Sequence, residues 1–154
     1  MKNITVCFTG HREIPVEEAE SVAASLENVI RELIGRGYRI FAAGGALGFD
    51  TMAAQTVLRL RDSFPEIMLH LVLPCLTQTR GWSKEDIAVY EQIKDAADDV
   101  TYTSRERTRG CMFLRNRQLV ERSGVCVCFL RKQTGGTAYT VKYAKANGLE
   151  VVCL

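Results

Sequence analysis

Short apolar runs alternate with amphipathic stretches along the whole chain. Six runs are apolar at most positions, which predicts strands over residues 4–10, 38–45, 67–74, 99–104, 124–130 and 149–154. Between them, apolar residues recur three and four positions apart, as one face of a helix requires. This spacing predicts five helices: 15–35, one from the glycine-rich turn at 44–48 to about residue 62, 83–97, 110–122 and one within 135–148.

Several of the predicted helices also carry end signals. Pro15 suits a first turn, Glu17 and Glu18 favour the positive helix start, and Gly35 suits the end. A capping box is indicated by Ser83 and Asp86 at the start of the helix over 83–97.

The order of these elements predicts the fold. Strands that alternate with helices form parallel sheets whose crossovers cover both faces. We therefore expect a single domain over residues 1–154, with a Rossmann-like three-layer α/β/α fold and a mostly parallel six-stranded sheet. No internal repeat or low-complexity linker divides the chain.

The composition is ordinary for a globular protein, with 47% hydrophobic and 25% charged residues. A net charge of +2 is too small to indicate a nucleic-acid-binding protein. The apolar stretch at the N-terminus is too short for a signal peptide, and no run approaches the roughly 18–20 apolar residues that span a bilayer. We expect a cytoplasmic protein that does not contact membranes.

Six cysteines raise the question of disulfides or a metal site. They stand at positions 7, 75, 111, 126, 128 and 153, without a C-x-x-C pair and with only two histidines in the chain. Cys126 and Cys128 alternate along an apolar strand, which places both on one buried face. We expect buried, reduced thiols, no metal site and no cofactor.

The loops after the strands are the expected place for a ligand. In an open parallel sheet, ligands bind beyond the carboxyl ends of the strands, near the point where the strand order reverses. The segments at these ends are 9–12, 44–50, 74–82, 103–111 and 131–137. Glycine recurs among these segments, and four of the segments contain arginine. Flexible backbone and cationic groups together favour a phosphorylated, nucleotide-like small molecule.

The turn at 44–50 offers two interpretations. Gly44, Gly45 and Gly48 permit unusual backbone conformations and close approach of a ligand, and the following helix start offers free amides to an anion. Asp50 could then bond a ribose hydroxyl. Alternatively, Asp50 caps the helix with its carboxylate and the glycines only form a tight turn.

A second glycine-rich turn follows the fifth predicted strand. Gly135, Gly136 and Thr137 would hold a phosphate by backbone amides and one hydroxyl at a helix start, unless they form a plain turn.

Thr9 and Gly10 end the first strand beside the expected reversal of strand order, and Arg12 is the candidate anion contact there. His11 is either a general base or, as we favour, a hydrogen-bonding structural group.

The predicted helix over 110–122 carries polar residues on an apolar face. Met112, Phe113, Leu119 and Val120 define that face, and Asn116 falls in its middle, where its amide must find partners. Asn116 could shape the pocket floor or touch the ligand. Arg115 lies to one side and could face the pocket, whereas Arg117 on the other side could pair with an acid such as Glu121 or lie in solvent.

Two aromatic residues could stack on a base. Trp82 follows the third predicted strand and either stacks there or covers the edge of the core. For Tyr139, inside a helix start, we expect packing.

The segments 8–12, 43–50, 73–82, 110–124 and 135–144 together resemble the SLOG superfamily, which includes the DNA-processing protein DprA/Smf and the LOG phosphoribohydrolases. The nearest branch is the small stand-alone YpsA/YspA-like bacterial proteins, and the resemblance spans nearly the whole chain. It implies a nucleotide or nucleotide-derived ligand held by Gly44, Gly45, Gly48 and Asp50, with Arg115, Gly135, Gly136 and Thr137 on the phosphate side. It also implies a homodimer.

One departure from that resemblance concerns catalysis. LOG enzymes carry a glutamate shortly after a glycine-threonine motif, which works with an arginine in cleaving the N-glycosidic bond. Here Thr140 stands at that position, and a hydroxyl cannot replace the carboxylate.

Three functions follow in order of preference. The first is a nucleotide-binding sensor or regulatory module, which implies a protein partner of unknown identity. The second is an N-glycosidic-bond hydrolase of nucleoside monophosphates, with Asp50 and Arg115 as candidate catalytic residues. The third is single-stranded DNA binding, which the lack of basic excess disfavours.

Overall fold

A six-stranded, wholly parallel sheet forms the centre of the molecule. The structure is a computed structural model that describes residues 1–154. In chain order the elements are η1 (Lys2–Ile4), β1 (Thr5–Gly10), α1 (Val16–Gly35), β2 (Ile40–Ala43), α2 (Phe49–Arg61), β3 (Met68–Leu73), α3 (Lys84–Ala96), β4 (Asp99–Tyr102), α4 (Cys111–Glu121), β5 (Val125–Phe129), α5 (Gly136–Ala146) and β6 (Glu150–Cys153). The predicted fold class is confirmed.

The strand order is β4-β3-β2-β1-β5-β6, so the chain reverses its direction of travel across the sheet at β1. β1 lies between β2 and β5, with Val6 in register with Phe41 on one side and Val125 on the other. The carboxyl ends of β1 and β5 therefore flank the place where parallel α/β sheets bind ligands.

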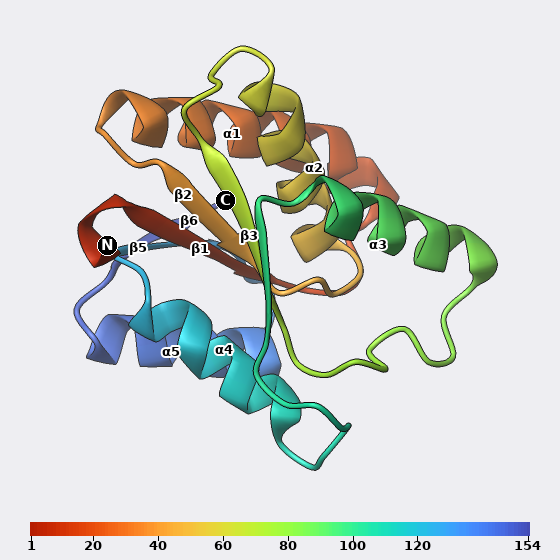
Figure 1. Cartoon of the computed structure of the whole chain (residues 1–154). Helices are drawn as coiled ribbons and strands as arrows, with labels where there is room; N and C mark the ends of the chain where they lie inside the picture. The colour runs from red at the N-terminus through yellow and green to blue at the C-terminus, as the bar shows by residue number, and fades with distance from the viewer.

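Helices cover both faces of the sheet, with α1, α2 and α3 on one face and α4 and α5 on the other (Figure 1). Alternate residues of the strands fill the two resulting cores. Phe8 and Phe129 pack beneath α1–α3 together with Phe41 and Phe49. Cys7, Cys126 and Cys128 point the other way, into the smaller core beneath α4 and α5, which confirms that Cys126 and Cys128 share a buried face.

The boundaries differ from the prediction by a few residues. The first strand begins at Thr5, because residues 2–4 form the short helix η1. Pro15 precedes α1 rather than standing in its first turn. The Ser83 cap is confirmed: its Oγ accepts a hydrogen bond from the Asp86 amide at 3.1 Å. None of the helices is both long and apolar enough to cross a bilayer.

Candidate functional site

A cleft of about 920 Å³ opens at the carboxyl ends of β1 and β5. It lies beside the reversal of strand order, as predicted from the fold class. Five parts of the chain line it: the end of β1 with the following segment, the start of α2, the loop after β3, the first turns of α4, and the loop between β5 and α5. The lining residues from these parts include Thr9, Gly10, Arg12, Ala46, Asp50, Gln78, Met112, Arg115, Asn116, Phe129, Arg131, Lys132, Gly135, Gly136 and Thr137.

The N-terminus of α5 faces this cleft without a side-chain cap. Gly135 is the N-cap residue with a φ of 98°, in the region that favours glycine, and no side chain bonds the first amides of the helix. A Cβ placed on Gly135 or Gly136 would meet no atom within 4 Å. The free amides and the positive end of the helix dipole are therefore open to an anion.

Arg115 brings a buried positive charge to the same cleft. Its side chain is 5% exposed, and its guanidinium donates hydrogen bonds to the Gly44 carbonyl oxygen and, at 2.7 Å, to Asn116 Oδ1. None of the six side-chain ion pairs of the molecule involves Arg115. Buried cations are usually paired, so this guanidinium retains the capacity to bind an anion in the cleft.

Asp50 is a buried acid whose charge interacts with that of Arg115. It lies in the first turn of α2, 6% exposed, and one carboxylate oxygen accepts a hydrogen bond from the Ala46 amide at 3.2 Å. Burial raises its pKa to about 6, although Arg115 and the amides of Ala46 and Gly44 act in the opposite direction. Asp50 therefore neither caps the following turn of α2 nor extends freely into the cleft; it holds the preceding loop.

The three glycines of the 44–48 turn do not line the main cleft, contrary to expectation. A Cβ on Gly44 would collide with the Arg115 guanidinium, and one on Gly48 with the backbone of Arg12. Gly45 and Gly48 also have φ values of 75° and 76°. These glycines make room for the protein's own groups, and only Ala46 and Asp50 from this turn reach the cleft.

His11 and Arg131 join the two loops at the rim of the cleft. The backbone amide of Arg131 donates to His11 Nε2 at 2.8 Å, and its guanidinium pairs with Glu18 at 3.0 Å and lies 4.3 Å from the centre of the Phe129 ring. The pKa of His11 is lowered by partial burial and by the charges of Lys132 and Arg131. The neutral imidazole is thus a hydrogen-bond acceptor that positions the 131–137 loop, as the structural interpretation of His11 predicted.

The buried face of α4 is rotated by one residue from the prediction. Cys111, Arg115 and Leu119 are buried at a spacing of four, whereas Phe113 and Leu114 are 47% and 44% exposed. Arg115, not Asn116, is therefore the polar residue within the apolar face. The predicted phase is wrong because the exposed Phe113 was assigned to the apolar face, whereas Leu119 and Val120 are buried as predicted. Arg117 bonds the Tyr139 hydroxyl at 2.8 Å rather than pairing with Glu121.

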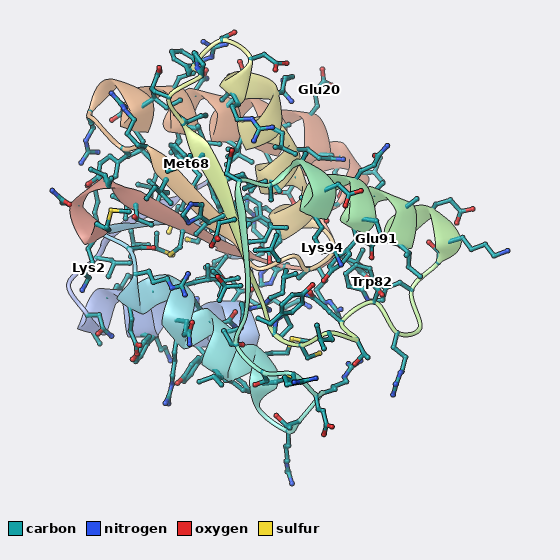
Figure 2. All side chains as sticks on the ribbon, viewed as in Figure 1. Lys2, Glu20, Met68, Trp82, Glu91 and Lys94 are labelled. Atoms are coloured by element: carbon teal, nitrogen blue, oxygen red, sulfur yellow. The ribbon has the colours of Figure 1, made fainter.

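Trp82 lies away from the cleft. Its ring packs edge-on against Tyr90 with 5.5 Å between centroids, and Figure 2 shows it beside α3, near Lys94 and Glu91. It does not line the cleft, so the structure favours its role in covering the core edge. Thr140 is also excluded from the cleft lining, because it is buried and its hydroxyl donates to the Gly136 carbonyl oxygen at 2.8 Å.

Gln78 is a site residue that the sequence pattern does not predict. It is 2% exposed, its amide donates to the Gly44 carbonyl oxygen at 3.1 Å, and its own oxygen accepts from the Tyr90 hydroxyl at 3.0 Å. The same Gly44 oxygen accepts from Arg115, so Gln78 helps fix the acceptor that orients the guanidinium. Because Gln78 lies in a loop, the spacing of apolar residues does not indicate that its side chain is buried.

Comparison with known proteins identifies the family of the chain and supports its fold. The profile of the YspA SLOG family matches residues 6–150. A UPF0398 protein of Halalkalibacterium halodurans is 31% identical over 127 residues, which cover 80% of this chain and 67% of that protein. Among solved structures, DNA processing protein A from Helicobacter pylori, studied there for its single-stranded DNA binding mode, has a TM-score of 0.71 at 18% identity, covering 99% of this chain and 65% of that one.

DNA processing protein A from Streptococcus pneumoniae is similar to the same extent, with a TM-score of 0.70 at 18% identity. The match covers 97% of this chain and 49% of that one, so this chain spans about half to two thirds of the two DNA processing proteins. At this identity the likeness establishes the fold. Because the family profile covers nearly all of the sequence, the chain belongs to the YspA SLOG family.

Proposed function

We propose that the cleft binds a nucleotide or nucleotide-derived ligand and that the protein acts as a sensor or regulatory module. The observation that carries this proposal is the convergence on one cleft of the uncapped α5 N-terminus and the buried Arg115, which forms no ion pair. Both features favour a phosphate, which accepts hydrogen bonds from amides and from a guanidinium fork. Membership of the SLOG family and the Rossmann-like fold support the nucleotide part of the proposal.

The remaining lining suits the rest of such a ligand. Ile14 and Pro15 contribute apolar surface to the lining, and Asn116 adds an amide beside Arg115. In this arrangement the phosphate lies at Gly135–Thr137 and the base lies along the 11–16 segment. The main role of Asp50 is to fix the preceding loop by accepting a hydrogen bond from the Ala46 amide. Its carboxylate contacts a sugar hydroxyl only if the sugar lies at the floor of the cleft.

A thermal-shift panel tests the proposal with nucleoside monophosphates, NAD, ADP-ribose, cyclic nucleotides and inorganic phosphate. A ligand at 100 times its Kd adds about 2.7 kcal/mol to the free energy of unfolding. We expect one nucleotide to raise the Tm by several degrees when phosphate alone does not. Arg12→Gln removes a cation at the cleft and should weaken the shift, whereas Arg109→Gln, an exposed arginine outside the lining, should not. No shift with any nucleotide would contradict the proposal.

A second candidate function is cleavage of an N-glycosidic bond. The observation in its favour is the raised pKa of Asp50, about 6, at a cleft that also contains Arg115. A carboxyl group with such a pKa can donate a proton near neutral pH. Incubation with nucleoside 5′-monophosphates, followed by chromatography, should then release free base, and Asp50→Asn should abolish release while binding persists. Saturating substrate without any released base would refute this function.

Single-stranded DNA binding is the outcome that would replace both candidates. The DNA processing protein A structures share the fold, and Arg105, Arg107 and Arg109 lie exposed in the loop before α4. Salt-sensitive binding of a labelled single-stranded oligonucleotide, not displaced by any mononucleotide, would favour DNA.

Homodimer formation also stays a prediction, tested by light scattering after size-exclusion chromatography.

A further inference from the structure

Two pairs of cysteines face each other across adjacent parallel strands. β1 and β5 align Cys7 with Cys126, and β5 and β6 align Cys128 with Cys153. Adjacent strands lie about 4.8 Å apart, which falls within the range of Cα separations that a disulfide can span. Both pairs therefore meet the backbone requirement for a disulfide.

Solvent access distinguishes the two pairs. Cys7 and Cys126 are both buried in the core beneath α4 and α5. Cys128 is buried as well, but its partner Cys153 is exposed on β6, which forms one edge of the sheet. The Sγ atoms of Cys128 and Cys153 are 3.2 Å apart. Only this pair combines a thiol that a dissolved oxidant can reach with a second thiol already in contact.

We propose that Cys128 and Cys153 are a peroxide-reactive thiol pair that forms a reversible disulfide between β5 and β6. The Cys153 thiolate attacks one oxygen of hydrogen peroxide, the O–O bond breaks, and the departing oxygen takes a proton and leaves as water. The Cys128 sulfur then attacks the resulting sulfenic acid, loses its proton and displaces a second water. The two thiols lose two electrons in total, and one peroxide is reduced to two waters.

The surroundings of the two sulfurs set this order of events. Burial, together with the hydrogen bond to Cys153, raises the pKa of the Cys128 thiol to about 12, so it stays protonated at neutral pH. The thiolate is the nucleophile, so the buried, protonated Cys128 is a poor first one. It reacts second, losing its proton as it attacks, because the sulfenic acid forms in contact with its sulfur. The exposed Cys153 therefore reacts with peroxide, and Cys128 resolves the product.

The test is peroxide titration of the folded protein, followed by thiol counting, intact mass and peptide mapping. We expect two of the six thiols to disappear, a Cys128–Cys153 cross-link in the peptide map, and recovery of both thiols with dithiothreitol. Cys153→Ser should abolish the loss. Cys7→Ala, from the matched buried pair, should leave it unchanged, with Cys111→Ser as a second control.

A further variant makes the first step visible. In Cys128→Ala, Cys153 should accumulate as a sulfenic acid that dimedone traps, because the second thiol is missing. Retention of all six thiols at peroxide concentrations that oxidise free cysteine would overturn the proposal. So would a Cys7–Cys126 cross-link formed in its place, or stable overoxidation of Cys153 beside a reduced Cys128.

Discussion

The turns at 44–48 and 134–137 look alike in sequence, since each places glycines between a strand and a helix, yet their surroundings are opposite. Around Gly44 and Gly48 the space that a side chain would fill is already occupied by Arg115 and by the backbone of Arg12. Around Gly135 and Gly136 the same space is empty and belongs to the cleft. A glycine-rich turn thus permits close approach, but only the fold decides whether protein or ligand makes that approach.

Alanine substitution at one position of each turn gives the largest expected contrast. Gly48→Ala combines a φ of 76° with a backbone collision and should lower the free energy of unfolding by about 4 kcal/mol. Gly136→Ala has open space and no positive φ, so its effect should stay within about 0.5 kcal/mol. Urea unfolding measures both, and similar losses in the two variants would remove the distinction.

The buried charge behind the first turn gives the next effect. Arg115→Met removes the donor to the Gly44 carbonyl oxygen and leaves Asp50 without its neighbouring cation, at an expected cost of about 3 kcal/mol. Adding Asp50→Asn should recover part of this loss, because the carboxylate is then gone. If the two single losses simply add in the double variant, Asp50 and Arg115 are energetically independent and this account of the cleft floor is wrong.

Asp50 also predicts a pH dependence with a definite sign. Its pKa rises from 3.8 to about 6 on folding, so between these values the native state binds more protons than the unfolded state. The contribution of Asp50 to stability is therefore complete below about pH 4 and is lost as the pH rises through 6, by about 3 kcal/mol. The free energy of unfolding of the wild type minus that of Asp50→Asn, followed from pH 4 to 7, measures this contribution and should fall as the pH rises. If this difference stays constant or rises, the pKa of the buried carboxyl is not raised.

The smallest effect is expected at the rim of the second turn. Arg131→Gln removes an ion pair with Glu18 whose side chains are 41% and 35% exposed, so the loss of stability should be about 0.5 kcal/mol. The Arg131 amide still donates to His11, and the loop should keep its position. A loss of several kcal/mol in urea unfolding would mean that the side chain, rather than the backbone, holds this loop.

The order of elements and the sheet were predictable, because the spacing of apolar residues and the length of the apolar runs specify strands and helices. The location of the cleft was predictable because parallel sheets bind ligands at the carboxyl ends of their strands. Which residues face the cleft was only partly predictable. Arg115 and Asn116 differ by one residue along α4, and the exposed Phe113, which the pattern places on the apolar face, obscured which of them is buried. Gln78 and Trp82 lie in one loop and both contact Tyr90, but only Gln78 also bonds the Gly44 carbonyl oxygen and lines the cleft.

The most direct test of the central claim is the amide spectrum of ¹⁵N-labelled protein during titration with the nucleotide selected by the thermal-shift panel. The account predicts that the largest shifts belong to the amides of Gly136, Thr137 and Ala138, the free donors of α5, while those of Gly44, Gly45 and Gly48 change little. Dominant shifts in the 44–48 turn, with the α5 amides unchanged, would contradict the account and return the phosphate to the first glycine-rich turn.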